Sequence, residues 1–222
     1  MIYQPMKDGD NVKFKIEQPK ILVELLETKS IRSLESKDEI SNGVIENTTI
    51  ESQDAIKVSM DKMIFRNVTI TESSLEQIEL TDIVFENCDF SNVNFSSSFM
   101  HRIEFRNCKL IGTSFSQSRF QNVRFLDCLG DFANFRFATF KQAGFEDCSL
   151  ISADYYNSTF QKIFFTRCNI DQAYMIGSKL MGVDLSDCTF DELSVELQDL
   201  DGCMISSHQA STFVGLMGMI IR

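Results

Sequence analysis

Residues 115–155 have the sequence FSQSRFQNVRFLDCLGDFANFRFATFKQAGFEDCSLISADY, in which every fifth residue is large and apolar except Gly130. The same period extends in both directions: of the 30 multiples of five from Met60 to Ile205, 29 are apolar or aromatic. A period of five matches neither the 3.6 residues of a helical turn nor the two-residue repeat of a flat strand. The chain is therefore expected to turn a corner at every fifth residue and to wind into a β-solenoid.

A second inward position lies two residues before each large one. Its occupants are mostly small or β-branched, as at Val93, Ala133 and Ser158, which leaves room for the large neighbour. Six cysteines occupy this position at intervals of 20 residues, namely Cys88, Cys108, Cys128, Cys148, Cys168 and Cys188. Twenty residues are four fives, so each coil is expected to have four sides, with successive cysteines stacked roughly 4.8 Å apart.

The cysteine column has two interpretations. Stacked thiols could serve as a metal or redox ladder, but metal ligands converge on one point, whereas these side chains form a line. The other interpretation is that thiols are small, adaptable fillers of a narrow core. We favour the second, and expect all seven cysteines, including Cys203 on another side, to be inward fillers with no metal or cofactor bound.

The five-residue units resemble those of a known family. Ala133-Asn134-Phe135, Ala153-Asp154-Tyr155 and Cys88-Asp89-Phe90 are similar to the A-[DN]-[LF]-x-x motif of pentapeptide repeat proteins, and the resemblance covers about residues 40–205. It implies an all-β fold, a right-handed quadrilateral β-helix with four pentapeptides per coil and stacked central side chains. Residues 1–39 would then form an N-terminal cap or arm, and residues 206–222 a C-terminal segment.

The C-terminal segment has a resemblance of its own. Ser206 or Ser207 can cap a short helix through about Val214, after which glycines end the helix and an apolar strand follows. This pattern is similar to the C-terminal segment through which Qnr and MfpA proteins dimerise. The resemblance implies a homodimer, with Phe213, Leu216, Met217, Met219 and Ile220 as the expected interface.

The same resemblance carries an expectation about function. Qnr and MfpA proteins bind DNA gyrase and topoisomerase IV, Qnr proteins protect these enzymes from quinolones, and their acidic rods imitate duplex DNA. The repeat region here lacks the loops that interrupt Qnr proteins from Gram-negative bacteria, and residues 1–39 have no counterpart in them. The alternative is a scaffold or regulatory protein with an unassigned partner.

Charge and composition limit the classes of function. The 222 residues include 32 acidic and 21 basic side chains, which gives a formal net charge of −11 and argues against direct binding of nucleic acid or of anionic membranes. Two histidines and a filled interior make an enzyme unlikely on chemical grounds. We find no secretory signal and no apolar stretch of 18 residues, so a cytoplasmic location is expected.

The charges are unevenly distributed. The candidate partner-binding residues form an acidic band near the C-terminus that contains no base: Asp184, Asp187, Asp191, Glu192, Glu196, Asp199 and Asp201. Another side carries a basic stripe, namely His101, Arg102, Arg119, Lys141, Lys162 and Lys179, which argues against mimicry of DNA around the whole rod. The band has a second interpretation as a solvated surface that aids solubility.

The N-terminal 39 residues are outside the period. Val12–Ile16 alternates as a strand does, Ile21–Leu26 is a short apolar run, and Lys29–Glu39 is charged and expected to be a loop. A solenoid needs a cover for the open end of its core, so a cap is the first interpretation and a partner-binding arm the second. At Gly130 the central side chain is missing, which predicts a local irregularity or a kink unless Leu129 or Phe132 turns inward.

Overall fold

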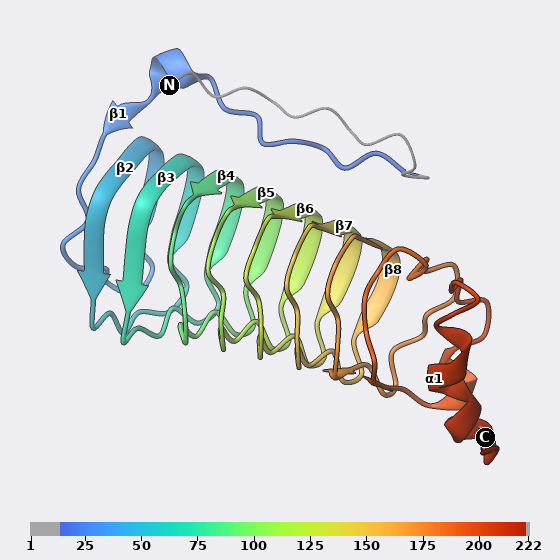
Figure 1. Cartoon of the computed structure of the whole chain (residues 1–222). Helices are drawn as coiled ribbons and strands as arrows, with labels where there is room; N and C mark the ends of the chain where they lie inside the picture. Colours follow the sequence, from blue (N-terminus) through green and yellow to red (C-terminus); the bar gives the residue numbers. More distant parts are fainter. Residues whose placement is uncertain (1–13, 221–222) are drawn as a thin grey trace.

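The computed structural model describes residues 14–220, which wind into a single coil of stacked parallel strands with a short helix at its C-terminal end (Figure 1). The main sheet has the order β1-β2-β3-β4-β5-β6-β7-β8, and β9 pairs with β10. The elements are η1 (Val23–Leu25), β1 (Glu27–Thr28), β2 (Glu39–Glu51), β3 (Ser59–Thr71), β4 (Glu79–Glu86), β5 (Phe99–Arg106), β6 (Arg119–Leu126), β7 (Thr139–Glu146), β8 (Thr159–Thr166), β9 (Ala173–Tyr174), β10 (Leu193–Ser194), η2 (Leu197–Asp199), α1 (Ala210–Val214) and η3 (Gly215–Met217).

The strand pairing confirms the 20-residue coil. All residues of β4 except Asp82 pair in parallel with the residue 20 positions later in β5, as Phe85 does with Phe105, and all residues of β5 except Arg102 pair with β6 in the same way. The other sides of the coil are joined by single bridges with the same offset, such as Asn94 with Ser114. In one coil the four sides are residues 103–107, 108–112, 113–117 and 118–122, and we refer to these and their equivalents as the first to fourth sides.

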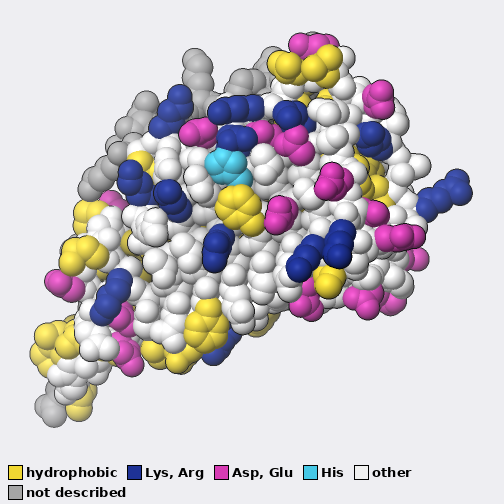
Figure 2. Space-filling view, turned by 180° about the vertical axis from the view of Figure 1, so that it is seen from behind, with side chains coloured by type: hydrophobic (Ala, Val, Ile, Leu, Met, Phe, Trp, Pro, Cys, Tyr) yellow, Lys and Arg dark blue, Asp and Glu magenta, His cyan; other side chains and the backbone are white. Residues whose placement is uncertain are grey.

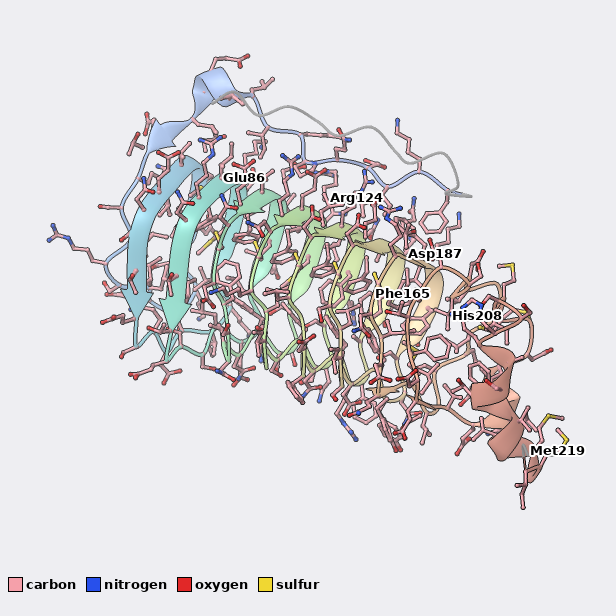
Figure 3. The ribbon with its side chains drawn as sticks, viewed as in Figure 1. Glu86, Arg124, Phe165, Asp187, His208 and Met219 are labelled. Carbon is pink, nitrogen blue, oxygen red and sulfur yellow. The ribbon has the colours of Figure 1, made fainter. Side chains whose placement is uncertain are left out.

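The core consists of stacked central side chains, as the period predicts. On the first side, the ring centroid of Phe125 lies 4.8 Å from that of Phe105 and 4.5 Å from that of Phe145, with the rings nearly parallel. On the third side, Phe135 stacks on Phe115 at 5.3 Å and meets the first-side rings edge to face. Figure 3 shows Phe165 at the end of the first stack, inside the coil. The spacing of the rings is close to the spacing of strands, so each stack adds one aromatic ring per coil.

The small inward side chains join successive coils by hydrogen bonds. The Sγ atom of Cys128 donates to the carbonyl of Phe105 at 3.5 Å, and Ser118 Oγ donates in the same way to the carbonyl of Phe95 at 3.0 Å. The six stacked cysteines are all buried and free. Burial raises the pKa of the Cys188 thiol to about 12, so it stays protonated and able to donate at neutral pH. The prediction that these cysteines are inward fillers is confirmed.

Gly130 interrupts the large inward positions without interrupting the coil. Leu129 and Phe132 are both exposed, so neither replaces the missing side chain. The Cδ2 methyl group of Leu150 in the next coil instead lies 3.0 Å from where a Cβ of Gly130 would be. The amide of Gly130 donates to the carbonyl of Ser149 at 2.7 Å, so the ladder between coils continues through this position.

The N-terminal segment has two parts. Leu34 is buried and Ile31 packs against the core at the open end of the first coils, as expected of a cap. Residues 14–20 instead run along the outside of the coil, above strands β4 to β8 in Figure 1. The predicted strand at Val12–Ile16 is wrong for Phe14–Ile16, which belong to no strand; the carbonyl of Lys15 accepts a hydrogen bond from the side chain of Gln142 instead. The first two residues of this prediction lie outside the described range. The predicted loop at Lys29–Glu39 is confirmed except for its last residue, Glu39, which begins β2. Within the short apolar run Ile21–Leu26, Val23–Leu25 form one 3-10 turn.

The C-terminal segment covers the other end of the core. The ring of Phe213 packs against that of Phe190, with 5.9 Å between the ring centroids, and the side-chain amide of Gln209 donates to the backbone carbonyls of Leu185 and Cys188. The helix predicted up to Val214 is present, but it begins at Ala210 without a side-chain cap and continues as η3 through Gly215. The predicted apolar strand is absent from residues 215–220, where Gly215–Met217 form η3 and Gly218, with φ 73°, ends it.

Candidate interaction surfaces

Six of the seven acidic residues predicted to bind a partner are exposed on the last coil. We call them the acidic collar: Asp184, Asp187, Asp191, Glu192, Glu196 and Asp201. Applying the 20-residue coil, Asp187 lies on the first side, Asp191 and Glu192 on the second, and Glu196 on the third. The collar therefore surrounds the rod instead of marking one face, and Figure 3 shows Asp187 near the C-terminal end.

Asp199, the seventh predicted residue, has a structural role. It is 2% exposed, accepts a hydrogen bond from the amide of Gly177 at 2.8 Å, and forms an ion pair of 3.2 Å with Lys179. A carboxylate that satisfies the backbone of the preceding coil is not free to contact a partner. Asp199 is therefore removed from the candidate partner-binding residues, and Lys179 of the basic stripe is neutralised with it.

The density of charge differs between the collar and the whole rod. The eight or so coils span about 40 Å at roughly 4.8 Å each, a length over which duplex DNA carries about 24 phosphate charges. The net charge of −11 is less than half of that. The six collar carboxylates, however, fall within 18 residues, which is less than one coil, where a duplex carries about three charges. Residues 72–89 also contain six acids and no base, but three of these acids, Asp82, Glu86 and Asp89, form ion pairs with bases of neighbouring coils. Among the described coils, the collar alone combines the charge density of DNA with exposure of all its carboxylates.

The basic side chains of the middle coils are mostly paired with acids. Arg66 contacts Glu46 at 2.8 Å and Glu86 at 2.7 Å, and Arg106 contacts Glu86 at 3.3 Å, so charges alternate from coil to coil. Further pairs are Arg102–Asp82, Arg124–Glu146, Arg136–Asp154 and Arg167–Asp147. Figure 2 shows the resulting mixture of basic and acidic side chains over one face. The middle of the rod is consequently a weak imitation of a polyanion.

Residues 14–20 form an N-terminal strap along the corner between the fourth and first sides. Three side chains in one column of the coil hold its main chain, the first two of them two coils apart and the last two one coil apart. Asp82 accepts a hydrogen bond from the backbone amide of Lys20 at 2.8 Å, and Asn122 accepts one from the backbone amide of Glu17 at 3.1 Å. Gln142 donates to the carbonyl of Lys15 at 2.9 Å. Three extended residues span about 10 Å, the same as two coils. The strap therefore matches the rise of the rod.

The strap buries apolar and charged groups against the coil. Ile16 and Pro19 are buried, and the ring of Phe14 lies 5.8 Å from that of Phe164. Figure 3 places Arg124, which is also buried, on the side of the coil along which the strap runs. The sequence gives little sign of this contact, because its partners are 62 to 127 residues apart and the strap itself has no period.

Asp82 is the anchor of the strap that responds to pH. Burial opposes its ionisation, but the hydrogen bonds from Arg102 and from the Lys20 amide outweigh burial and hold the pKa of Asp82 below its usual range. The carboxylate is therefore ionised at neutral pH, where the Arg102 guanidinium bonds it at 2.7 Å.

The predicted dimer residues divide into two groups. Phe213 is buried against Phe190 and serves the end of the core, so it is unavailable to a second chain unless the helix moves. The other four residues, Leu216, Met217, Met219 and Ile220, are exposed, and Ile220 is 87% exposed. They form an apolar C-terminal tip, which is seen as a hydrophobic cluster at the lower left of Figure 2 and which contains Met219, labelled in Figure 3.

Residues 14–220 contain no group of three or more His, Cys, Asp or Glu side chains arranged to hold a metal ion. In the same residues no helix is long and apolar enough to cross a membrane.

Together these features define a four-sided parallel β-solenoid whose two ends are covered and whose chemistry lies on its surface. Residues 98–175 match the family model described as "Pentapeptide repeat region", and residues 64–102 match "Pentapeptide repeats (8 copies)". The chain belongs to the pentapeptide repeat family. No curated protein sequence matches it.

Several solved structures have a similar fold. Full-length QnrB1, described as a plasmid-mediated fluoroquinolone resistance protein, is 20% identical, with 86% of this chain and 100% of that chain covered and a TM-score of 0.55. A trypsin-treated form of QnrB1 is 19% identical, with 86% and 99% covered and a TM-score of 0.52. HetL of Nostoc sp. strain PCC 7120, described as involved in heterocyst differentiation regulation, is 15% identical, with 79% and 85% covered and a TM-score of 0.43. At these identities the likeness concerns the fold alone.

Proposed function

We propose that the protein is a non-enzymatic interaction rod that binds a type II topoisomerase, DNA gyrase or topoisomerase IV, at the surface that normally holds DNA. The observation that carries this proposal is the acidic collar, since six exposed carboxylates within one coil match or exceed the charge density of a duplex. A groove that attracts phosphates attracts such a collar for the same electrostatic reason. The resemblance of the C-terminal segment to Qnr and MfpA proteins gives this choice of partner, and the proposal includes protection from quinolones because QnrB1, which has a similar fold, is described as a fluoroquinolone resistance protein.

The proposal includes a homodimer formed by the apolar C-terminal tip. Four exposed apolar side chains at the end of a covered rod are a surface that a second copy can bury. End-to-end pairing brings two collars close to the centre of a rod about twice as long. The acidic region presented to the topoisomerase is then twice as long as in one chain, while the mixed charges of the middle coils point outward along both arms.

A supercoiling assay with DNA gyrase, with and without ciprofloxacin, tests the proposed function. The test variant combines Asp191→Asn, Glu192→Gln, Glu196→Gln and Asp201→Asn. The matched control removes four exposed acids at the other end of the rod: Glu39→Gln, Glu51→Gln, Glu72→Gln and Glu79→Gln. We expect the natural protein and the control to inhibit supercoiling by gyrase or to relieve the inhibition of gyrase by ciprofloxacin. The collar variant should do neither. Absence of both effects with the natural protein at micromolar concentration contradicts the proposal.

The dimer is tested by light scattering on the full chain. The natural protein should have twice the 25.4 kDa mass of one chain, and the double substitution Met217→Asp and Ile220→Asp should have the mass of one. A natural protein that is monomeric at high micromolar concentration, or a double variant that stays dimeric, shows that the tip is not the interface.

A further inference from the structure

Two phenylalanines occupy corners at which the fold otherwise places polar residues or glycine. The φ angles of Phe132 and Phe137 are 60° and 58°, in the left-handed region that bulky side chains disfavour. The equivalent corners of neighbouring coils are Asn92, Gly112, Ser152 and Gln172 in one column and Ser97, Gln117, Asn157 and Gly177 in the other. The two rings are 63% and 49% exposed, so they contribute little to the core. Neither backbone preference nor burial explains them, and such outliers point to function.

Phe137 belongs to a larger cluster on the third side of the rod, and Phe132 lies five residues before it, at the corner where the second side meets the third. The guanidinium of Arg136 lies 4.4 Å from the ring centroid of Tyr156 and 5.7 Å from that of Phe137. The rings of Phe137 and Tyr156 meet edge to face at 5.5 Å, and Tyr156 lies 6.0 Å from Tyr174. We call Phe132, Arg136, Phe137, Tyr156 and Tyr174 the aromatic patch. Aromatic residues and arginine held in fixed positions are the composition of binding hot spots.

The surroundings of the aromatic patch are acidic. From residue 88 onward, the second and third sides carry seven acids, which are Asp89, Asp131, Asp154, Asp171, Asp191, Glu192 and Glu196. The same two sides carry only two bases within residues 88–197, Lys109 and Arg136. Both are paired, Lys109 with Asp89 at 3.6 Å and Arg136 with Asp154 at 2.9 Å. An aromatic centre with an acidic rim complements an apolar surface with a basic rim.

The aromatic patch also lies away from the N-terminal strap formed by residues 14–20. The N-terminal strap lies on the corner between the fourth and first sides, where Asp82, Asn122 and Gln142 hold it. The corner between the second and third sides is diagonally opposite that corner, so residues 14–20 do not cover the third side. The rim extends to Asp191, Glu192 and Glu196, which are also part of the acidic collar. A partner on the third side therefore has both apolar contact and a continuous field of negative charge.

We propose that the aromatic patch is a second docking surface, for a protein segment with an apolar centre and a lysine- or arginine-rich rim, such as a basic amphipathic helix. This site goes beyond the proposed function, because it uses aromatic contact on the third side and does not depend on a topoisomerase. An acidic partner segment is excluded by the unpaired acids of the rim. Phosphate-bearing partners are excluded for the same reason.

The test measures binding of a fluorescent amphipathic helical peptide made of leucine and lysine, at a salt concentration that screens exposed charges. The counterpart peptide, with glutamate in place of lysine, is the negative control. The test variant is Phe132→Asn with Phe137→Asn, which leaves the charge unchanged and introduces the residue type that the fold uses at Asn92 and Asn157 in the same columns. We expect at least a roughly tenfold loss of affinity for the lysine peptide in this variant. The expected unfolding midpoint is unchanged or higher.

A matched control separates aromatic contact from charge. The variant with Asp191→Asn and Glu192→Gln loses two charges and keeps the rings, so its affinity should fall less than that of the phenylalanine variant. Equal binding of the lysine peptide by the natural protein and the phenylalanine variant overturns the proposal. So does failure of the natural protein to bind this peptide, or a marked fall in the unfolding midpoint of the phenylalanine variant, which would make the rings structural. Loss of gyrase inhibition leaves these results unaffected, so the two proposals fail independently.

Discussion

Replacement of Phe125 by alanine removes a ring that is stacked on both faces. The ring is 1% exposed, lies 4.8 and 4.5 Å from its two stacked neighbours, and also meets Phe120 and Phe135 edge to face. Truncation of a buried phenylalanine costs about 3–5 kcal/mol. The loss should be at the upper end, about 5 kcal/mol, because the backbone ladders above and below fix the coil spacing and prevent the cavity from collapsing.

Phe65→Ala is the matched comparison near the first coils. Phe65 is equally buried, but it has one described ring neighbour, Phe85 at 5.0 Å. It therefore loses one aromatic contact where Phe125 loses several, each worth about 0.5–1.5 kcal/mol beyond area. We expect a cost nearer 3 kcal/mol, measured by urea unfolding followed by circular dichroism. A Phe125→Ala cost below about 2 kcal/mol, or a larger cost for Phe65→Ala, refutes the reasoning that two-sided stacking stabilises the rod.

Three further predictions concern the thiols, the strap and one glycine. Cys188 is buried, and burial raises the pKa of its thiol to about 12, so its labelling by a thiol reagent at neutral pH should follow the unfolding rate; rapid labelling of Cys188 in the native protein contradicts this. Because the pKa of Asp82 is held below its usual range, the strap contact is intact above about pH 4 and weakens as the pH falls further, which should appear as faster hydrogen exchange of the amides of residues 14–20. The Asp82→Ala variant should show this faster exchange already at neutral pH, and unchanged exchange in the variant argues against Asp82 as the anchor. A Cβ at Gly144 would lie 2.1 Å from the ring of Phe164, so Gly144→Ala should displace that ring and loosen the strap, whose Phe14 packs against it. The free energy of unfolding in urea should fall by about 1–3 kcal/mol, whereas an unfolding free energy and a hydrogen exchange equal to those of the natural protein would refute this.

The repeat region could be predicted from sequence almost residue by residue, because each coil repeats the same requirement for an inward side chain. The column of cysteines at 20-residue intervals was enough to count the sides, and the parallel pairing of Phe85 with Phe105 confirms it. The ends were harder, because they have no period. The strap depends on contacts with Asp82 and Gln142 far along the chain, and local alternation at Phe14–Ile16 wrongly indicated a strand.

The surface was predicted less well than the core. The position of the acidic band followed directly from the sequence, but the burial of Asp199 depends on Gly177 and Lys179 in the coil beneath it. Phe213 appeared to belong with the exposed tip because it is apolar and close in sequence, yet it faces the core. The signal for the aromatic patch was present in the sequence, since Phe132 and Phe137 are off the five-residue period. It becomes interpretable only when the corner conformation is known.

The most direct test of the central claim is a competition experiment between this protein and duplex DNA for DNA gyrase. The claim is that the acidic collar occupies the surface of the enzyme that holds DNA. It predicts that an increasing concentration of duplex DNA displaces the labelled protein from gyrase, and that binding of the protein to gyrase weakens as the salt concentration rises. The collar variant with four substitutions should fail to bind, while the control with four acids removed at the other end of the rod should bind normally. Simultaneous binding of protein and duplex by gyrase, or equal binding by the two variants, would contradict the claim.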